Sequence, residues 1–524
     1  MVAKKVNCDK VVVSENRSKI LFDSDVIRCE DKLLYSYEEA LTVAGHGRYS
    51  YLLLLLLSLT LMAMGLDMFG FSVVVTGCSC EFELTQTQKG ILGSMPYAGP
   101  IVMSYTWGYI SDTRGRRRSL LVAMLGASAV SALSALSPNW VVLAVMKLVG
   151  TSFVSCAQSA TFSLLGESCC QRVRGPYLFI MSTVMHTCPI IYFSLGYLIL
   201  GLDFSYDVGF MLFSPWRLYI LILSLAPLIG FFCMLPLVES PKFLANQDRE
   251  EEALKALERI WVINGGEPNM YPVRRIILDE APRVEVTSLA RSLWEQTAPL
   301  FKPPYLKYTL QLYYITIVLY GTCNSLMTWL PFVANDYFAS TKSSDNIGLC
   351  DVLGDNDVDA NYSSNSTDIF TPECSSKLKQ ETLFVGVALG TTFTTINILM
   401  SLASSRKKCL SLMFSLLGFT GTIGVIFGTN PVLVLPFYVL CLTTSIQIGI
   451  LSSYYVILFP SLNRGMAGCL GVMVARLSAL AGINLAGAAM FSACHATFGF
   501  FAVFILSGAL MACFLPSDNI SKLL

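Results

Sequence analysis

A single short segment, residues 108–117 (GYISDTRGRR), combines glycines, one acid and several arginines at a spacing that could do chemistry. A guanidinium group binds a carboxylate in a planar, bidentate way, so Asp112 can form ion pairs with the arginines that follow it. Glycine lets the backbone of a turn approach its neighbours closely. Such a cluster can hold two parts of a protein together in one conformation and release them in another. The alternative, that the arginines merely anchor a loop, leaves the glycines and the acid unexplained. The residues expected to form this gate are Gly108, Asp112, Gly115, Arg116 and Arg117.

Glu167 and Arg174 lie on either side of the point where a later apolar segment ends. We expect this pair to belong to the same gate rather than to a substrate site. Their side chains again allow a guanidinium–carboxylate pair.

Four other candidate residues lie inside apolar segments. Three of them are ionisable, and an ionisable group there costs about 2.5–3.5 kcal/mol on insertion scales, which makes it a functional candidate. Asp67 can bind a cation or carry a coupling proton, or it can be a hydrogen-bonded structural acid. His186 can titrate near neutral pH or simply pack with a hydrogen bond. Trp329 can stack on a ligand or anchor the chain at the membrane interface. Arg476 can be a counter-charge in a cavity or a salt-bridge partner. The acid at position 67 favours cationic or neutral solutes.

The composition requires a membrane around most of these residues. Of the 524 residues, 54% are hydrophobic and 14% are charged, against roughly 25% charged in an ordinary soluble protein. The mean hydropathy is +0.59, which excludes a cytosolic enzyme or a nucleic-acid binder. The charges balance, with 36 basic and 36 acidic residues, so the net charge does not indicate an anionic partner. The first ten residues lack the apolar stretch of a cleavable signal peptide.

The apolar segments predict an all-α polytopic membrane protein of about twelve spanning helices, since each span needs about 20 mostly apolar residues. The expected spans are 50–76, 90–110, 119–137, 140–164, 176–200, 216–237, 308–333, 382–403, 409–428, 432–458, 466–490 and 495–515. Lys and Arg concentrate in alternate connections, which places both termini in the cytoplasm.

Two connections are long. Residues 238–305 are expected to be a cytoplasmic linker whose segment 247–262 forms an amphipathic helix, more simply read as a cap on the bundle than as a partner site. Residues 335–381 are expected to be exoplasmic, with glycosylation at Asn361 and Asn365. Cys350 and Cys374 lie in this loop, and an oxidising compartment favours a disulfide between them.

The two halves of the chain echo each other. Three pairs of matching segments, each offset by roughly 280–295 residues, indicate a duplicated six-helix unit with a substrate site between the copies. The expected division is 1–48 as a cytoplasmic segment, 49–237 as the first bundle, 238–305 as the linker, 306–515 as the second bundle with its exoplasmic loop, and 516–524 as a cytoplasmic tail.

The motif at 108–117 resembles the loop signature of the major facilitator superfamily. Further stretches are similar to its sugar-porter and organic-ion branch: Glu167 with Arg174-Gly175, Trp216-Arg217, and Glu239 to Leu244. The segments 37–41 (YEEAL) and 45–49 (GHGRY), with Trp329-Leu-Pro331, resemble the synaptic vesicle glycoprotein 2 family. The chain departs from that family in having one acid in its first span, with Met64 at the other position, and a short exoplasmic loop. The second-half copy of the loop motif has also lost its acid.

The resemblance implies two pseudo-symmetric six-helix bundles and secondary active transport of a small organic solute by alternating access, with a proton or a cation as the coupling ion. The alternative is a transporter-shaped protein that moves no solute and instead regulates or docks vesicles. We expect no enzyme activity, cofactor, metal or nucleic-acid partner, because no phosphate-binding loop or catalytic metal motif is present. We expect a monomer in the lipid bilayer of the plasma membrane or of secretory or synaptic vesicles.

Overall fold

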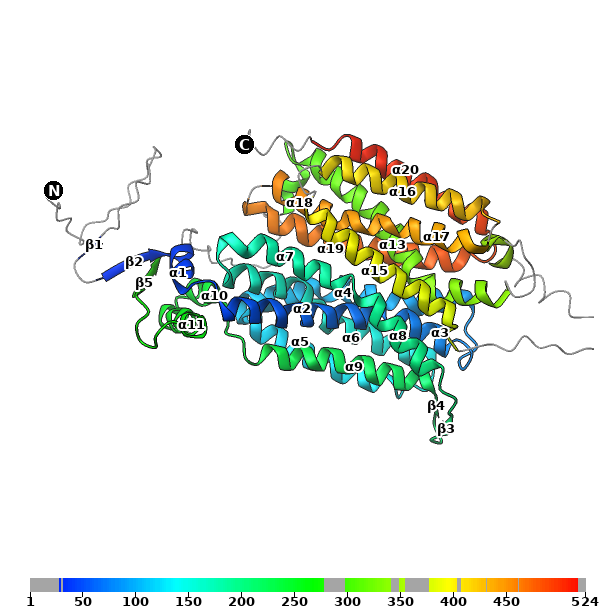
Figure 1. Ribbon diagram of the computed structural model, residues 1–524, viewed down its shortest axis with the longest axis horizontal. Coiled ribbons are helices and arrows are strands. Elements are labelled where there is room, and N and C mark those ends of the chain that lie inside the picture. Colours follow the sequence, from blue (N-terminus) through cyan, green and yellow to red (C-terminus); the bar gives the residue numbers. More distant parts are fainter. Residues whose placement is uncertain are drawn as a thin grey trace, which may run out of the picture.

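The computed structural model describes residues 28–29, 32–277, 297–340, 348–353, 377–402, 407–429, 431–459 and 461–516. Long helices run side by side along the long axis, with the first half of the chain in one layer and the second half in the other (Figure 1). We call the end that carries residues 112–118 and 171–174 the basic end, and the opposite end the far end.

The first half contains α2 (Arg48–Phe69), α3 (Phe71–Cys78), α4 (Gln86–Arg114), α5 (Arg116–Ser134), α6 (Trp140–Ser168), α7 (Gln171–Met185), α8 (Cys188–Leu200) and α9 (Pro215–Met234). The second half contains α13 (Leu306–Ser340), α15 (Gln380–Leu402), α16 (Lys407–Phe427), α17 (Pro431–Leu442), α18 (Gln447–Leu458), α19 (Ser461–Ala489) and α20 (Cys494–Cys513). Ten helical segments of the described chain are long and apolar enough to cross a membrane. With α4 and α5, they make up the expected spans.

Helices α4 and α5 are not among these ten segments. On α5, Ser119, Ser128, Ser131 and Ser134 are buried. Small side chains let helices pack closely where lipid supplies no hydrophobic driving force between them. The spans expected at 90–110 and 119–137 coincide with these two helices.

Three expected spans are interrupted. The first divides at Gly70 into α2 and α3, and the fifth divides into α7 and α8 just before Pro189. A proline lacks the backbone donor that would continue the helix. The tenth span passes through a 3₁₀ turn, η2 (Thr443–Ile446), between α17 and α18.

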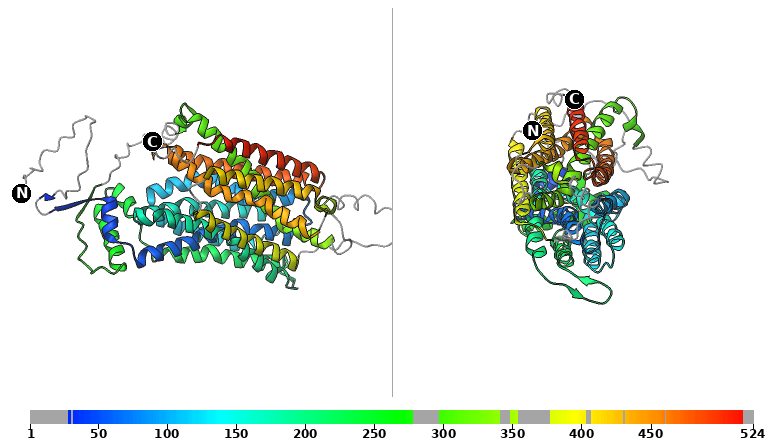
Figure 2. Two further views of the ribbon diagram at one scale, coloured as in Figure 1. Left: turned by 45° about the horizontal axis from the view of Figure 1, so that its top comes forward. Right: turned by 90° about the vertical axis from the view of Figure 1, so that its right-hand side faces the viewer.

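The hydrophobic core shows how the halves meet. One continuous core at the far end contains residues of both halves, among them Phe193 of α8, Trp329 of α13 and Phe491 after α19. At the basic end each half has its own core, built around residues such as Leu120 in the first half and Leu312 in the second. The described halves therefore share one apolar core at the far end and have separate apolar cores at the basic end. Figure 2 shows the two layers of helices from two further directions.

A small cap lies against the basic end of the first half (Figure 1). It consists of β1 (Arg28–Cys29), β2 (Lys32–Ser36), α1 (Tyr37–Ala44), α10 (Pro241–Asn246), α11 (Glu250–Ile263) and β5 (Arg275–Ile277), with β2 parallel to β5. The apolar face of α11 is buried through Ala253, Leu257 and Ile260. The amphipathic helix is thus a cap on the bundle, and the segment before the first span is part of the same unit.

The disulfide prediction is wrong. Cys350 is bonded to Cys494, at the start of α20, with 5.3 Å between their Cα atoms. Cys374 lies outside the described residues, as do Asn361 and Asn365. The pairing joins residues 144 positions apart, and proximity along the loop could not reveal it. Cys80, beyond the end of α3, is also disulfide-bonded.

The remaining elements lie outside the helical layers. A hairpin of β3 (Tyr206–Asp207) and β4 (Leu212–Phe213) projects from the far end before α9 (Figure 1). The turn η1 (Ala298–Phe301) precedes α13, and Leu300 is buried in the second-half core at the basic end.

Candidate substrate site and gate

A small pocket lies between the halves, near the middle of the helices. It is lined by Met64, Met68, Pro96, Pro100, Thr151, Val154, Ser155, Gln158 and Arg476. These residues come from α2, α4 and α6 of the first half and α19 of the second. The cavity measures about 10 Å³, which is room for about one water molecule. A solute larger than that requires the halves to separate further.

Of the four predicted site residues, Arg476 alone lines this pocket. Its side chain is 4% exposed. It donates from Nη2 to Gln158 Oε1 at 2.6 Å and from Nη1 to Met68 Sδ at 3.3 Å, while Nε has no partner. Arg476 thus connects the two halves without forming a salt bridge to a carboxylate among the described residues.

Asp67 is paired within the first half. Its Oδ1 lies 2.9 Å from Nζ of Lys147 on α6, and Ser131 donates to the same oxygen at 3.3 Å. Lys147 also donates to the backbone oxygen of Asp67. The two charged side chains are 3% and 6% exposed, whereas Asp67 Oδ2 has no hydrogen-bond partner. Asp67 is therefore a buried acid that is paired with Lys147 and has one carboxylate oxygen without a hydrogen bond.

His186 and Trp329 lie outside the pocket. His186 follows α7, where its Nδ1 lies 3.0 Å from the carbonyl oxygen of Ser182. Trp329 is 3% exposed and donates to the carbonyl oxygen of Ile483 at 3.1 Å. Its ring packs on Phe491 in the shared far-end core. In this conformation Trp329 is neither a ligand cap nor a lipid-facing anchor.

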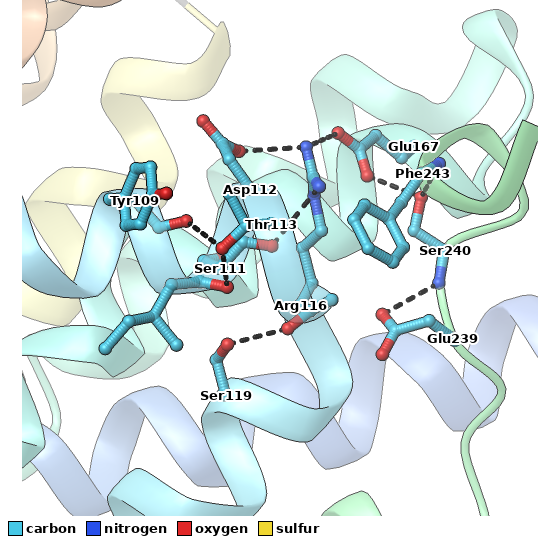
Figure 3. A network of polar contacts seen from close by, with 12 residues as sticks. Tyr109, Ser111, Asp112, Thr113, Arg116, Ser119, Glu167, Glu239, Ser240 and Phe243 are labelled. Atoms are coloured by element: carbon cyan, nitrogen blue, oxygen red, sulfur yellow. Dashed lines mark hydrogen bonds and ion pairs between the residues drawn. The ribbon is translucent and has the colours of Figure 1, made fainter. Parts of the chain in front are cut away.

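The gate residues form a polar network at the basic end (Figure 3). Arg116 is central: its Nη2 lies 3.1 Å from Asp112 Oδ1 and 3.0 Å from Glu167 Oε1. Its Nη1 donates to the carbonyl oxygen of Ser111. Ser240, which begins α10, donates to the other oxygen of Glu167. The network joins α4, α5, α6 and the start of the cap, all within or against the first half.

Glu239 completes the network at the start of α5. It accepts from the backbone N–H groups of Arg117 and Arg118 at 2.9 and 3.2 Å. A carboxylate is stabilised at a helix N-terminus by the unpaired N–H groups and the helix dipole. Gly115 has φ +102°, and a Cβ there would lie 2.4 Å from Glu239 Oε2. The turn needs this glycine for both reasons.

Two expectations about the gate need correction. Glu167 and Arg174 do not pair with each other: Glu167 binds Arg116, and Arg174 lies 2.7 Å from Glu38 of α1. The reason is tertiary, because α1 brings an acid to the end of α6. Gly108 faces open space, with nothing within 4 Å of a Cβ, so no close approach depends on it here.

The cap contributes a further buried contact to this region. Tyr37 of α1 is 3% exposed and donates to the backbone oxygen of Glu167. Burial, together with the negative charge of Glu167, raises the pKa of Tyr37 well above its ordinary value. The hydroxyl therefore remains a donor over the whole physiological pH range.

Two residues that contact the predicted site residues, Lys147 and Gln158, were not among the predicted site residues. Lys147 was visible as an ionisable residue in an apolar segment, and this costly placement was the signal for a buried partner. Gln158 carried no such signal, because a single amide in a helix is unremarkable until its neighbours are known.

A family model described as the Major Facilitator Superfamily matches residues 55–350. Among curated proteins, the chain is similar to synaptic vesicle glycoprotein 2A of Rattus norvegicus and of Homo sapiens, with 24% identity over 341 residues in each case, which covers 60% of this chain and 46% of the relative. It is 22% identical over 238 residues to synaptic vesicle glycoprotein 2B of Homo sapiens, covering 45% of this chain and 35% of that one. The chain thus spans less than half the length of these relatives.

Among solved structures, the fold is similar to a partially occluded inward-open conformation of the xylose transporter XylE from E. coli. The TM-score is 0.64 at 13% identity, covering 90% of this chain and 100% of the other. A D-xylose–proton symporter structure matches with a TM-score of 0.60 at 15% identity, covering 90% and 99%. The structural similarity establishes a shared fold of two six-helix bundles. At identities this low it establishes the fold alone.

Proposed function

The chain belongs to the major facilitator superfamily, and we propose that this multi-pass membrane protein carries a small organic solute across a bilayer by alternating access. Proteins of this architecture bind solute near the membrane midplane between two repeats, which rock around the site.

One observation supports the proposal above the others: the halves share a core at the far end and have separate cores at the basic end. A static docking scaffold needs no such difference. A carrier that exposes its site to one side at a time does need it. The pocket that contains Arg476 lies where the shared core ends.

The orientation follows from the charges. With Arg116, Arg117, Arg118 and Arg174 at the basic end, the positive-inside rule makes this end cytoplasmic. Both termini and the cap would then be cytoplasmic, and the conformation described here would open toward the cytoplasm. The division of the chain into bundles at 49–237 and 306–515 is proposed on the same basis.

The gate would work through the Arg116 network. While the basic end is open, Asp112, Glu167 and Glu239 hold the 111–118 turn against the first half. Closing this end would bring the second half toward that turn. Part of the network would then exchange partners between the two states.

Coupling would involve the buried pair of Asp67 and Lys147. A proton placed on the free oxygen of Asp67 would remove the carboxylate charge that holds the ammonium group. The helices α2 and α6 that carry the pair also line the pocket. Proton occupancy and solute occupancy would thereby affect the same two helices.

The test is a thermal-shift screen of the purified full chain at two pH values, followed by uptake of each stabilising compound into proteoliposomes with and without a pH gradient. The panel contains sugars including D-xylose, amines, nucleosides and carboxylates, because a ligand that binds the native state raises its stability. Asp67→Asn should abolish gradient-driven accumulation, while Glu251→Gln on the exposed surface of α11 should leave it unchanged.

The outcome that would contradict transport is equally definite. If no compound stabilises the protein or enters the vesicles, and Asp67→Asn remains folded and behaves like the parent, the chain is not a carrier. A non-transporting regulator of vesicles would then be the better account.

A further inference from the structure

We infer that the solute carries a carboxylate group, and that Arg476 is the residue that binds it. This inference rests on the proposed function, because it names the chemical class of solute for the same central site. It reverses the preference for cationic or neutral solutes that Asp67 alone suggested.

The buried charges near the middle of the helices differ in whether they are paired. Asp67 is not available to attract a cation, because Lys147 neutralises it at 2.9 Å inside the first half. Arg476 has no such partner among the described residues. Among the residues that line the pocket, Arg476 is the charged one, so the described lining carries one positive charge.

The second step concerns the burial of Arg476. A charge removed from water is strongly destabilising unless a counter-charge and hydrogen bonds replace its hydration. The guanidinium group is 4% exposed, and its partners are an amide oxygen and a thioether sulfur, with Nε unpaired. The ring of Tyr97 lies nearby, with its centroid 5.9 Å from the guanidinium carbon. Because all of these contacts are neutral, the positive charge of Arg476 has no counter-charge among the described residues, and one bound anion would supply it.

The third step is the chemistry around the pocket. The planar fork of Arg matches the two oxygens of a carboxylate. Gln158 lines the same pocket, and its amide group can turn to donate N–H to a bound oxygen. Thr151 and Ser155 add hydroxyl groups to the wall, while Met64, Pro96 and Val154 give it an apolar side. Such a wall suits a compact anionic head attached to an apolar or weakly polar body.

The fourth step favours a monoanion. One arginine compensates one negative charge, and the second charge of a dianion such as a phosphate monoester would meet no further cation among the residues that line the pocket. The anion would also contact both halves at once, because Arg476 belongs to α19 while Gln158 belongs to α6. Binding the head group would replace the direct Arg476–Gln158 contact that now joins the halves.

The experiment compares acids with their uncharged analogues on the purified full chain. Benzoate and lactate, as sodium salts at constant ionic strength, are compared with benzamide, lactamide and choline by thermal shift and by equilibrium binding. Benzoate or lactate should bind at least tenfold more tightly than the matching amide, and choline should give no shift. Succinate, a dianion, should bind more weakly than the monocarboxylates.

The variants locate the effect. Arg476→Gln should weaken carboxylate binding at least tenfold, and Arg476→Lys should weaken it less because the charge remains without the fork. Lys307→Gln removes one positive charge from an exposed position of the same half and should leave binding unchanged. Gln158→Leu should weaken binding while conserving every charge. If Arg476→Gln does not fold, the acid–amide comparison on the parent and the Gln158→Leu variant still decide.

Two results would overturn the inference. If the amides or choline bind as tightly as the acids, or if carboxylate binding survives in Arg476→Gln, the solute is not held by its charge on Arg476, yet transport of another solute class stands. If no compound of any charge binds or is taken up, the proposed function fails and this inference fails with it.

Discussion

The two halves of the molecule share a fold but treat buried charge differently. In the first half, the charged residues that are buried are Asp67, Arg116, Lys147 and Arg217. Each contacts an opposite charge: Asp67 and Lys147 pair with each other, Arg116 with Glu167, and Arg217 with Glu81. In the described second half, Arg476 is the buried charged residue, and no carboxylate pairs with it.

This difference separates what the fold needs from what the site needs. Helix packing in a bilayer depends on apolar faces and small residues, and both halves have these. The ion pairs of the first half lie within that half. The cap adds one more ion pair to it, between Glu38 and Arg174. In the second half, Arg476 has neutral hydrogen-bond partners and no carboxylate partner among the described residues. Two halves with similar backbones can therefore differ in whether their buried charges are paired within the half.

The largest expected effect comes from breaking a pair in the first half. Lys147→Met should lower the free energy of unfolding by about 3–5 kcal/mol, because it leaves Asp67 as an uncompensated buried charge. Arg476→Gln in the second half should change it by no more than about 1 kcal/mol, since it removes a charge that has no counter-charge. Chemical unfolding in detergent micelles measures both.

A double variant controls this comparison. Asp67→Asn combined with Lys147→Met removes both charges and should recover most of the lost stability. Equal destabilisation by Lys147→Met and Arg476→Gln would show that both halves balance their buried charges internally. The halves would then not differ in how they pair buried charge.

The next effect tests where the halves meet. Gly487 of α19 lies where a Cβ would be 2.7 Å from the ring of Trp329 and 3.3 Å from the Cα of Gly90. Gly487→Leu should cost about 1–3 kcal/mol through overpacking and should separate the far ends. Spin labels across the far end would report a longer distance. Gly499→Leu is the matched control, because nothing lies within 4 Å of that position.

A smaller effect is expected at the gate. Glu239→Gln should lower stability by about 1–2 kcal/mol, because the neutral amide interacts less favourably with the N–H groups and dipole at the start of α5. Hydrogen exchange of the 111–118 turn should increase in this variant. Glu251→Gln, on the exposed face of α11, should leave exchange there unaltered. Identical hydrogen exchange of this turn in the two variants would mean that Glu239 does not stabilise it.

The smallest effect concerns the cap, which packs on the first half. Tyr37→Phe removes the hydrogen bond to the Glu167 carbonyl and should cost about 1 kcal/mol at neutral pH. Burial and Glu167 raise the pKa of Tyr37 in the folded state. This contribution is therefore complete below about pH 10, the ordinary pKa of tyrosine, and is lost as the pH rises above it.

A pH series of thermal unfolding checks that sign. The parent should lose more stability than Tyr37→Phe between neutral and strongly alkaline pH, whereas Tyr206→Phe, in the exposed hairpin, should lose as much as the parent. The opposite order would mean that the Tyr37 hydroxyl is not held in its protonated form by the cap.

Much of the fold could be predicted because it depends on local properties of the chain. The spans follow from runs of apolar residues, and the breaks at Gly70 and Pro189 occur at residues that disfavour a continuous helix. The amphipathic pattern of α11 gave its buried face. By contrast, Cys350 binds Cys494 and Arg174 binds Glu38 because distant segments meet in space, and no spacing along the chain contains that information.

Hydropathy and charge act on each segment separately, so the amino-acid sequence is enough to predict a membrane protein of paired helical bundles with charges concentrated at one end. The pairing of the buried charges depends instead on how distant helices pack. Lys147 lies against Asp67, whereas no carboxylate among the described residues pairs with Arg476, and the energy of a buried charge depends on what packs within a few ångströms of it. The sign of the solute expected at the centre changed for that reason.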